Sequence, residues 1–287
     1  MENLQSDHLD TQNLYRDMQK RTGGEIYIGV VGPVRTGKST FIKRFMDVAV
    51  LPYMEDAAQK TRAQDELPQS AGGRTITTTE PKFIPQEAVE LKLAGEVTIR
   101  VRLVDCVGFM VEGAAGHLEN GAERLVKTPW YDHEIPFTQA AELGTRKVIT
   151  DHSTIGVVVT TDGSFSDLPQ ETYLDAENQA ISELKKLHKP FLVLVNSSHP
   201  SSRTAREAAE RIEKQHSVAA MPVNCAQLSE EDIRQIMEQI LYEFPVSRVE
   251  FYMPKWVEML PLSHPLKTGL IEKIRELTGK IRTIRDV

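Results

Sequence analysis

One short segment constrains the fold of this chain more than any other. Residues 32–39 read GPVRTGKS and match the pattern G-x-x-x-x-G-K-[ST]. A β-rich apolar run at 26–31 precedes them, and a stretch with helical periodicity follows from Lys38. A strand, a glycine-rich turn and a helix in this order are typical of a phosphate-binding loop. The alternative is a chance glycine turn before a helix, and the full pattern in this context disfavours it.

Each residue type in this loop has a chemical reason. Gly32 and Gly37 let the backbone approach phosphate oxygens, and N–H groups at the helix start attract anions. We expect Lys38 to contact the β- and γ-phosphates and the Ser39 hydroxyl to coordinate Mg²⁺. Arg35 either supplies fixed positive charge near the phosphates or is a solvated loop residue. The predicted nucleotide-binding residues of the loop are Gly32, Pro33, Val34, Arg35, Thr36, Gly37, Lys38, Ser39 and Thr40.

An acidic residue at the end of a second apolar strand completes the predicted magnesium site. The strand expected at 97–104 alternates apolar and polar residues and runs into Asp105. An Asp in this position usually anchors Mg²⁺, generally through water. Asp105 and Gly108 also fit the D-x-x-G pattern of switch segments, in which the glycine N–H contacts the γ-phosphate. We therefore predict Gly108 as a further nucleotide-binding residue.

A group of threonines lies between these two motifs, at positions 75, 77, 78 and 79. In switch-type NTPases a threonine from this segment completes the Mg²⁺ shell and reports the γ-phosphate. Spacing favours Thr78 or Thr79; the alternative is that these β-prone residues only begin a strand. The predicted catalytic residues are Lys38, Thr78, Thr79 and Asp105, and the predicted metal ligands are Ser39, Thr78 and Asp105.

The segment after the strand expected at 191–196 lacks the residues that read guanine. GTPases of this class carry N-K-x-D there, whereas this chain has Asn196 followed by Ser-Ser-His. Without that carboxylate, GTP specificity loses its physical basis, so we predict ATP as the nucleotide, with Asn196 among the cofactor-binding residues. Switch GTPases often carry a water-positioning Gln where this chain has Phe109. Hydrolysis is therefore expected to be slow or to use a group supplied by assembly.

The order of apolar runs predicts an α/β fold of the GTPase-like class of P-loop NTPases, with a mostly parallel doubly wound sheet, flanking helices and a C-terminal helical appendage. Expected strands lie at 79–84, 88–93, 97–104, 155–161, 191–196 and 221–225, and expected helices at 38–49, 169–188, 203–216 and 229–242. The expected divisions are a helical extension at 1–22, an ATPase domain at 23–243 with an insertion at about 109–150, and the start of a following region at 244–287.

Two of these divisions leave alternatives open. In the insertion, the aromatic residues Trp130 and Tyr131 form either a satellite cluster or a partner surface. Residues 246–260 are expected to be a strand plus a connector. The basic amphipathic helix expected at 266–286 is either a packed appendage or the lead into a further domain.

Composition excludes several classes of protein. A net charge of −7 argues against a protein that mainly neutralises nucleic-acid phosphates. The longest apolar runs are far shorter than a membrane span, and the acidic N-terminus does not look like a signal peptide. Two cysteines, Cys106 and Cys225, cannot make a disulfide framework. We expect both to be reduced core residues of a cytosolic protein.

Further segments of the chain carry specific motifs: RTGG at 21–24, GVVGPVRTGKSTFIK at 29–43, RAQDELPQS at 62–70, TTEPKF at 78–83, LVDCVG at 103–108, NG at 120–121, TPWY at 128–131, GTRKVI at 144–149 and HSTIGVV at 152–158. Together these segments resemble one family, the stage IV sporulation protein A family of endospore-forming bacteria. The resemblance covers about residues 20–260.

The resemblance implies a Mg²⁺-dependent P-loop ATPase that self-assembles into a static polymer, with its threonine sensor at Thr78 and Thr79. That polymer would form the base layer of the spore coat, in the mother-cell cytoplasm at the outer forespore membrane. Its partners would be further copies, a small amphipathic membrane-binding sporulation peptide and other coat morphogenetic proteins, with the membrane contacted only indirectly. Family members run on past residue 287, so we expect either the ATPase portion of a longer protein or a natural short form.

Two other functions stay open from the residues themselves. One is a GTPase-type switch that regulates a partner, which a preference for GTP over ATP would favour. The other is a structural protein that binds nucleotide without hydrolysing it.

Overall fold

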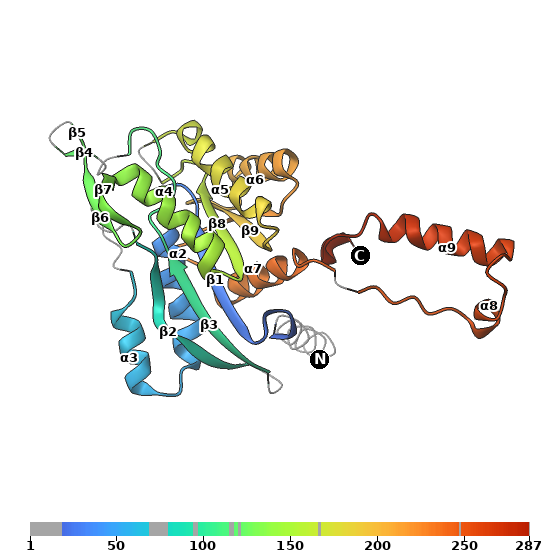
Figure 1. The fold of residues 1–287 in the computed structure, drawn as a ribbon. Coiled ribbons are helices and arrows are strands. Elements are labelled where there is room, and N and C mark those ends of the chain that lie inside the picture. Colours follow the sequence, from blue (N-terminus) through green and yellow to red (C-terminus); the bar gives the residue numbers. More distant parts are fainter. Residues whose placement is uncertain are drawn as a thin grey trace.

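The computed structural model describes residues 19–68, 80–93, 97–114, 118–119, 122–165, 168–246 and 248–286. A six-stranded sheet in the order β10-β9-β8-β1-β3-β2 forms the centre of this part of the chain (Figure 1). All neighbours pair in parallel except β2, which is antiparallel to β3. The bounds are β1 (Glu25–Val31), β2 (Lys82–Leu93), β3 (Val97–Asp105), β8 (Ile155–Thr161), β9 (Phe191–Asn196) and β10 (Ala220–Val223).

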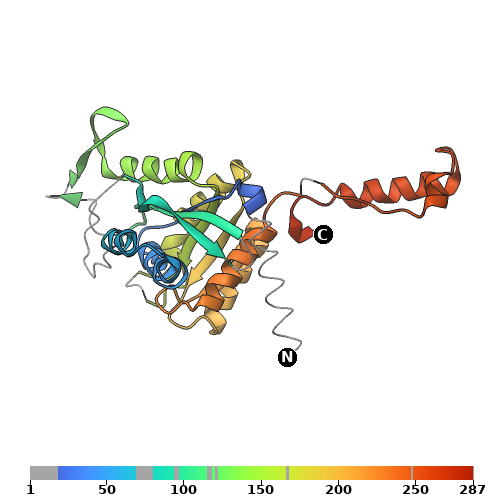
Figure 2. The same cartoon turned by 90° about the horizontal axis from the view of Figure 1, so that it is seen from below.

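Helices cover both faces of this sheet, as in a doubly wound fold. Figure 2 shows α2 (Lys38–Phe45) and α7 (Glu230–Tyr242) below the sheet and α4 (Phe137–Lys147) above it. One apolar cluster joins the sheet to α2 and α7, and a second joins its other face to η3 (Val148–His152), α5 (Leu174–Lys186) and α6 (Arg203–His216). Every residue of β8 is buried, as expected for a parallel strand covered on both faces. The predicted fold class is confirmed.

Several local elements differ from the sequence predictions. The two strands expected at 79–84 and 88–93 fall in one strand, β2, whose pairing with β3 shifts register between Ile84 and Val89. The helix expected at 38–49 continues from α2 as a π-helical turn, η1 (Met46–Val50), and then η2 (Leu51–Tyr53). A helix that was not predicted, α3 (Ala57–Asp65), follows η2. Asp56 caps α3 by accepting from the N–H groups of Ala58 and Gln59.

The helix expected at 169–188 is shorter than predicted. A 3-10 turn, η4 (Gln170–Tyr173), precedes α5, which begins at Leu174. The strand expected at 221–225 is shifted, because β10 ends at Val223 and the chain then turns into the loop that carries Cys225.

The insertion after β3 forms a projection beside the sheet. It contains β4 (Leu118–Glu119), β5 (Ala122–Glu123), β6 (Leu125–Thr128), β7 (Tyr131–Pro136) and α4, and β6 pairs with β7 as a hairpin (Figure 1). The hairpin is tied to the start of α4, because Phe137 N donates to Arg124 O at 2.8 Å and Thr138 N donates to Glu123 Oε1 at 3.1 Å. Trp130, at the hairpin turn, is half-buried and Tyr131 is exposed.

Residues 248–286 form an arm that leaves the end of α7 and returns to it (Figures 1 and 2). The arm contains α8 (Lys255–Glu258), α9 (Pro265–Thr278) and η5 (Ile284–Asp286). The strand expected within 246–260 is wrong: the described residues there are extended without strand pairing and then enter α8. The helix expected at 266–286 already ends at Thr278, and no residue of α9 is buried.

Candidate nucleotide-binding site

The predicted phosphate loop joins the end of β1 to the start of α2. Gly32 and Gly37 have φ angles of 129° and 97°, in the region that favours glycine. A Cβ atom at Gly32 would overlap the carbonyl oxygen of Val159, and one at Gly37 would overlap the side-chain amide of Asn196. Both glycines are therefore required by backbone angle and by space.

The loop lysine is buried among backbone oxygens. Lys38 is 5% exposed, and its Nζ donates to the Pro33 carbonyl at 2.5 Å. Thr36 Oγ1 lies 2.6 Å from Val159 O and 3.0 Å from Pro33 O, so it fastens the loop to β8. Burial lowers the pKa of Lys38, although the acidic groups of Cys106 and Asp105 oppose this effect. A cation held in this way gains most from an anionic partner that replaces its lost water.

Two of the predicted metal ligands, Ser39 at the start of α2 and Asp105 at the end of β3, meet beside this lysine. Ser39 Oγ donates to Asp105 Oδ2 at 2.8 Å, and Asp105 Oδ1 accepts from Cys106 N at 2.9 Å. Burial raises the pKa of Asp105, against the Ser39 hydrogen bond and the Lys38 charge. A hydroxyl and a carboxylate are the oxygen ligands that Mg²⁺ prefers. The residues present therefore fit a magnesium ion.

The segment after Asp105 is joined to the phosphate loop by backbone hydrogen bonds. Phe109 N donates to Gly32 O at 3.0 Å, and Val34 N donates to Phe109 O at 2.9 Å. The Phe109 side chain is fully buried in the apolar cluster that also contains Val34. From the sequence, Phe109 was interpreted only as a residue that replaces the water-positioning glutamine of switch GTPases. In the structure its side chain also packs in the apolar core.

Gly108 lies between the phosphate loop and the insertion. It has a φ of 99°, and a Cβ atom there would overlap Gly32 O and lie 2.6 Å from Lys38 Nζ. Its N–H donates to Thr145 Oγ1 at 3.1 Å. Thr145 was not among the residues predicted from the sequence. The one sequence feature that pointed to it is the GTRKVI segment at 144–149, which is part of the family resemblance.

Asn196 connects the phosphate loop to the loop after β10. Its Nδ2 donates to Thr36 O at 2.9 Å, and its Oδ1 accepts from Cys225 N at 3.0 Å. The following Ser197 is buried, and its hydroxyl accepts from His199 N at 3.0 Å. Asn196 thus positions the loop, and its predicted contact with nucleotide stays a prediction.

The structure brings most of the predicted site residues to the carboxyl ends of β1, β3 and β9, which is where open α/β sheets bind ligands. Arg35 is exposed and has a φ of 62°. Thr75, Thr77, Thr78 and Thr79 lie outside the described residues. Both cysteines are free and buried, as predicted. Over the described ranges, no helix is both long and apolar enough to span a membrane.

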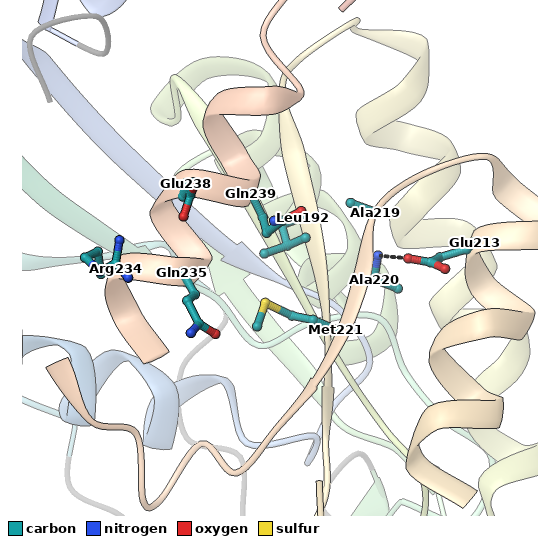
Figure 3. A pocket seen from close by; sticks show the side chains of 9 residues that line it. All are labelled: Leu192, Glu213, Ala219, Ala220, Met221, Arg234, Gln235, Glu238 and Gln239. Atoms are coloured by element: carbon teal, nitrogen blue, oxygen red, sulfur yellow. Dashed lines mark hydrogen bonds between the residues drawn. The ribbon is translucent and has the colours of Figure 1, made fainter. Parts of the chain in front are cut away.

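A separate pocket of about 480 Å³ opens at the β10 edge of the sheet. Figure 3 shows Leu192 and Met221 beside polar side chains of α7, and Glu213 of α6 accepting from the Ala220 N–H. None of the predicted site residues lines this pocket. Its lining residues are Leu192, Glu213, Ala219, Ala220, Met221, Arg234, Gln235, Glu238 and Gln239.

Comparison with known families gives two matches. The model described as Stage IV sporulation protein A, ATPase domain, matches residues 9–245, and the model described as the middle domain of the same protein matches residues 246–287.

Curated relatives named Stage IV sporulation protein A match nearly the whole chain. The protein from Clostridioides difficile (strain 630) is 48% identical over 96% of this chain and 56% of its own length. Those from Bacillus subtilis (strain 168) and Bacillus anthracis are 44% and 43% identical, each over 97% of this chain and 57% of its own length. The chain thus spans just over half the length of these relatives.

Comparison with solved structures matches crystal structures of SsGBP. A variant of that protein matches with a TM-score of 0.41 and 13% identity, over 82% of this chain and 64% of its own. The complex of SsGBP with GDP matches with a TM-score of 0.41 and 13% identity, over 75% of this chain and 48% of its own.

Proposed function

Because this chain belongs to the stage IV sporulation protein A family, we propose that it hydrolyses ATP with Mg²⁺ and that hydrolysis drives self-assembly of a coat-basement polymer on the developing spore surface. The family supplies an ATPase domain over most of the chain. The polymer, its place at the outer forespore membrane and its partners belong to the proposal.

The observation that carries the ATPase proposal is the contact between Ser39 and Asp105 beside the buried Lys38. Lys38 and the N–H groups at the start of α2 would hold the phosphates, and Ser39 and Asp105 would hold the metal. Bound Mg²⁺ supplies charge neutralisation on the phosphate oxygens. In this proposal Thr78 and Thr79 contact the γ-phosphate and complete the site.

Selectivity for ATP over GTP rests on the loop after β9. Positions 197–199 carry no carboxylate that could accept hydrogen bonds from guanine N1 and N2. Asn196 is already engaged by Thr36 O and Cys225 N, so its amide positions the loop. These features support ATP as the nucleotide.

The assembly proposal concerns the longer proteins of this family. We infer that the polymer grows by contacts between copies in the mother-cell cytoplasm. A small amphipathic membrane-binding peptide and other coat morphogenetic proteins would attach it to the forespore surface. In this proposal, ATP hydrolysis changes the conformation of the protein, and this change permits assembly.

The first test is phosphate release from the purified chain with Mg·ATP and, separately, Mg·GTP, over a range of protein concentrations. We expect release with ATP to exceed release with GTP. A rise in release per molecule with concentration supports hydrolysis coupled to assembly. Equal or greater release with GTP would contradict the ATP assignment and favour a GTPase-type switch. No release in the assembled full-length protein would favour a nucleotide-stabilised structural protein.

Two sets of variants test the residue roles. Lys38→Ala is expected to abolish ATP binding, and Lys43→Ala, an exposed lysine on the same helix, is the matched control. The double change Thr78→Ala with Thr79→Ala is expected to keep most ATP binding and lose hydrolysis. Unchanged ATP binding by Lys38→Ala would contradict the assignment of the phosphate loop as the nucleotide-binding site.

A further inference from the structure

The N–H group of Gly108 is held by a side chain from the insertion. Thr145, on the last turns of α4, is fully buried, and its Oγ1 accepts from Gly108 N at 3.1 Å. The same hydroxyl donates to Ala141 O at 2.8 Å. Since its one hydrogen goes to Ala141, the oxygen is free to act as an acceptor for Gly108.

The residues on either side keep Gly108 beside the phosphate loop. Phe109 N donates to Gly32 O, and the Gly108 backbone lies close to Lys38 Nζ. The peptide N–H that faces Thr145 thus belongs to a residue at the predicted γ-phosphate position. Glycine at φ 99° can accept a peptide rotation that would be strained for other residues.

We propose that Thr145 is a positioning residue that holds the Gly108 N–H away from the γ-phosphate until a nucleoside triphosphate displaces it. The inference rests on the proposed function, because it assumes nucleotide at the phosphate loop. One N–H makes one strong hydrogen bond, so Thr145 Oγ1 and a γ-phosphate oxygen compete for it. Thr145 therefore favours the diphosphate-bound and empty states over the triphosphate-bound state.

The position of Thr145 also links the nucleotide site to the projecting hairpin. Thr145 is near one end of α4, and the hairpin of β6 and β7 is fastened to the other end through the Phe137 N–H and Arg124 O. The Arg124 guanidinium also lies 4.4 Å from the centre of the Phe137 ring. Release of Gly108 from Thr145 therefore removes a contact between the nucleotide site and the helix that carries the hairpin.

The test compares the affinities of the chain for Mg·ADP and for a non-hydrolysable ATP analogue, AMP-PNP with Mg²⁺, by isothermal titration calorimetry. Thr145→Val keeps the shape of the side chain and removes the acceptor. It is expected to raise the affinity for AMP-PNP relative to ADP by about 3- to 10-fold, the size of one hydrogen bond. Thr145→Ser keeps the hydroxyl and is expected to keep the wild-type ratio.

Thr160→Val is the matched control. Thr160 is also a fully buried threonine, and its hydroxyl donates to Glu177 Oε2 at 2.6 Å on α5. Loss of this hydrogen bond is expected to lower the free energy of unfolding without changing the ratio of the affinities for AMP-PNP and ADP. Should Thr145→Val not fold, as judged by circular dichroism, Thr145→Ala removes the same acceptor and is read in the same way.

The outcomes separate the two proposals. An unchanged ratio in folded Thr145→Val or Thr145→Ala protein that binds both nucleotides overturns the role of Thr145 and leaves the proposed nucleotide site standing. An equal increase in Thr160→Val would also overturn it, because the effect would then be one of general loosening. Absence of nucleotide binding by the wild-type chain overturns both.

Discussion

The phosphate-loop edge of the sheet and the arm at 248–286 are built in opposite ways. At the loop, Lys38, Thr36 and Asn196 are buried, and hydrogen bonds join them to backbone atoms of the loop and of β8. In the arm, large apolar side chains face solvent: Tyr252 is 91% exposed and Met259 is 85% exposed. The arm touches the sheet domain mainly at its base, where Arg285 pairs with Glu243 at 2.7 Å.

Contacts within the sheet domain determine the structure of the phosphate loop. The arm at 248–286 makes few such contacts. A buried polar side chain is stable only when it has a partner, and Thr36, Lys38 and Asn196 find theirs within the chain. An exposed apolar helix gains little free energy from its own sequence, because most helical stability in proteins comes from packing. The arm is therefore expected to have the lower local stability.

The largest predicted difference comes from removing one aromatic ring in each region. Phe109→Ala is expected to lower the free energy of unfolding by about 3–5 kcal/mol, because the ring is fully buried against Val34. Trp256→Ala, at a side chain that is 61% exposed in the arm, is expected to change it by less than about 0.5 kcal/mol. Urea denaturation of both variants measures the two values. Similar losses would mean that the arm packs on the domain in solution.

The same substitution at two glycines sharpens the comparison. Gly32→Ala is expected to cost about 2–4 kcal/mol of unfolding free energy and to impair nucleotide binding, because the new Cβ meets Val159 O at a strained backbone angle. Gly269→Ala, in α9, has open space around its Cβ and is expected to favour the helix by about 1 kcal/mol. Circular dichroism and urea titration report both. A stable Gly32→Ala that binds ATP would contradict the assigned loop geometry.

Substitution of Asn196 tests the connection between the phosphate loop and the loop after β10. Asn196→Ala leaves the Cys225 N–H without its acceptor and is expected to cost about 1–3 kcal/mol of unfolding free energy. Asn196→Asp keeps that acceptor but loses the donor to Thr36 O, so an intermediate loss is expected. Chemical denaturation gives the order of the three proteins. An Asp variant less stable than the Ala variant would show that repulsion at Thr36 O outweighs the retained bond.

The buried thiols are expected to make the free energy of unfolding depend on pH. Burial raises the pKa of Cys106 from its ordinary value of 9.0 to about 11, and burial also raises the pKa of Cys225. Above pH 9 the unfolded chain loses thiol protons that the folded chain keeps, so stability is expected to fall between about pH 9 and about 11. Iodoacetamide at pH 8 should therefore leave both cysteines of the folded chain unmodified. Mass spectrometry measures this, and rapid alkylation of either thiol would contradict the burial.

Local chemistry was sufficient to predict a candidate nucleotide site. A phosphate loop needs glycines, a lysine and a hydroxyl at set positions, so Gly32, Lys38 and Ser39 identify it without any distant contact. The alternating strand at 97–105 likewise identified Asp105, because the period of a strand is visible in its own residues. Apolar runs and helical periodicity were sufficient to predict where most central strands and helices lie in the sequence.

Features that depend on distant partners could not be predicted in the same way. The part played by Thr145 depends on α4 lying against Gly108, a contact across 37 positions of the chain. The role of Asn196 similarly requires Thr36 and Cys225 on either side of it. The strand expected after residue 246 failed because apolar residues there suit a strand, but the described chain offers them no strand to pair with.

The amino-acid sequence by itself determined the family, the α/β class and the residues that would handle phosphate and metal, since these follow from local patterns of side-chain chemistry. Only the tertiary structure decided which groups hold those residues in place. It brought Ser39 to Asp105, Asn196 to the phosphate loop and Thr145 to the Gly108 N–H. The physical reason is that hydrogen-bond partners far apart in the chain are chosen by packing, and packing depends on all elements at once.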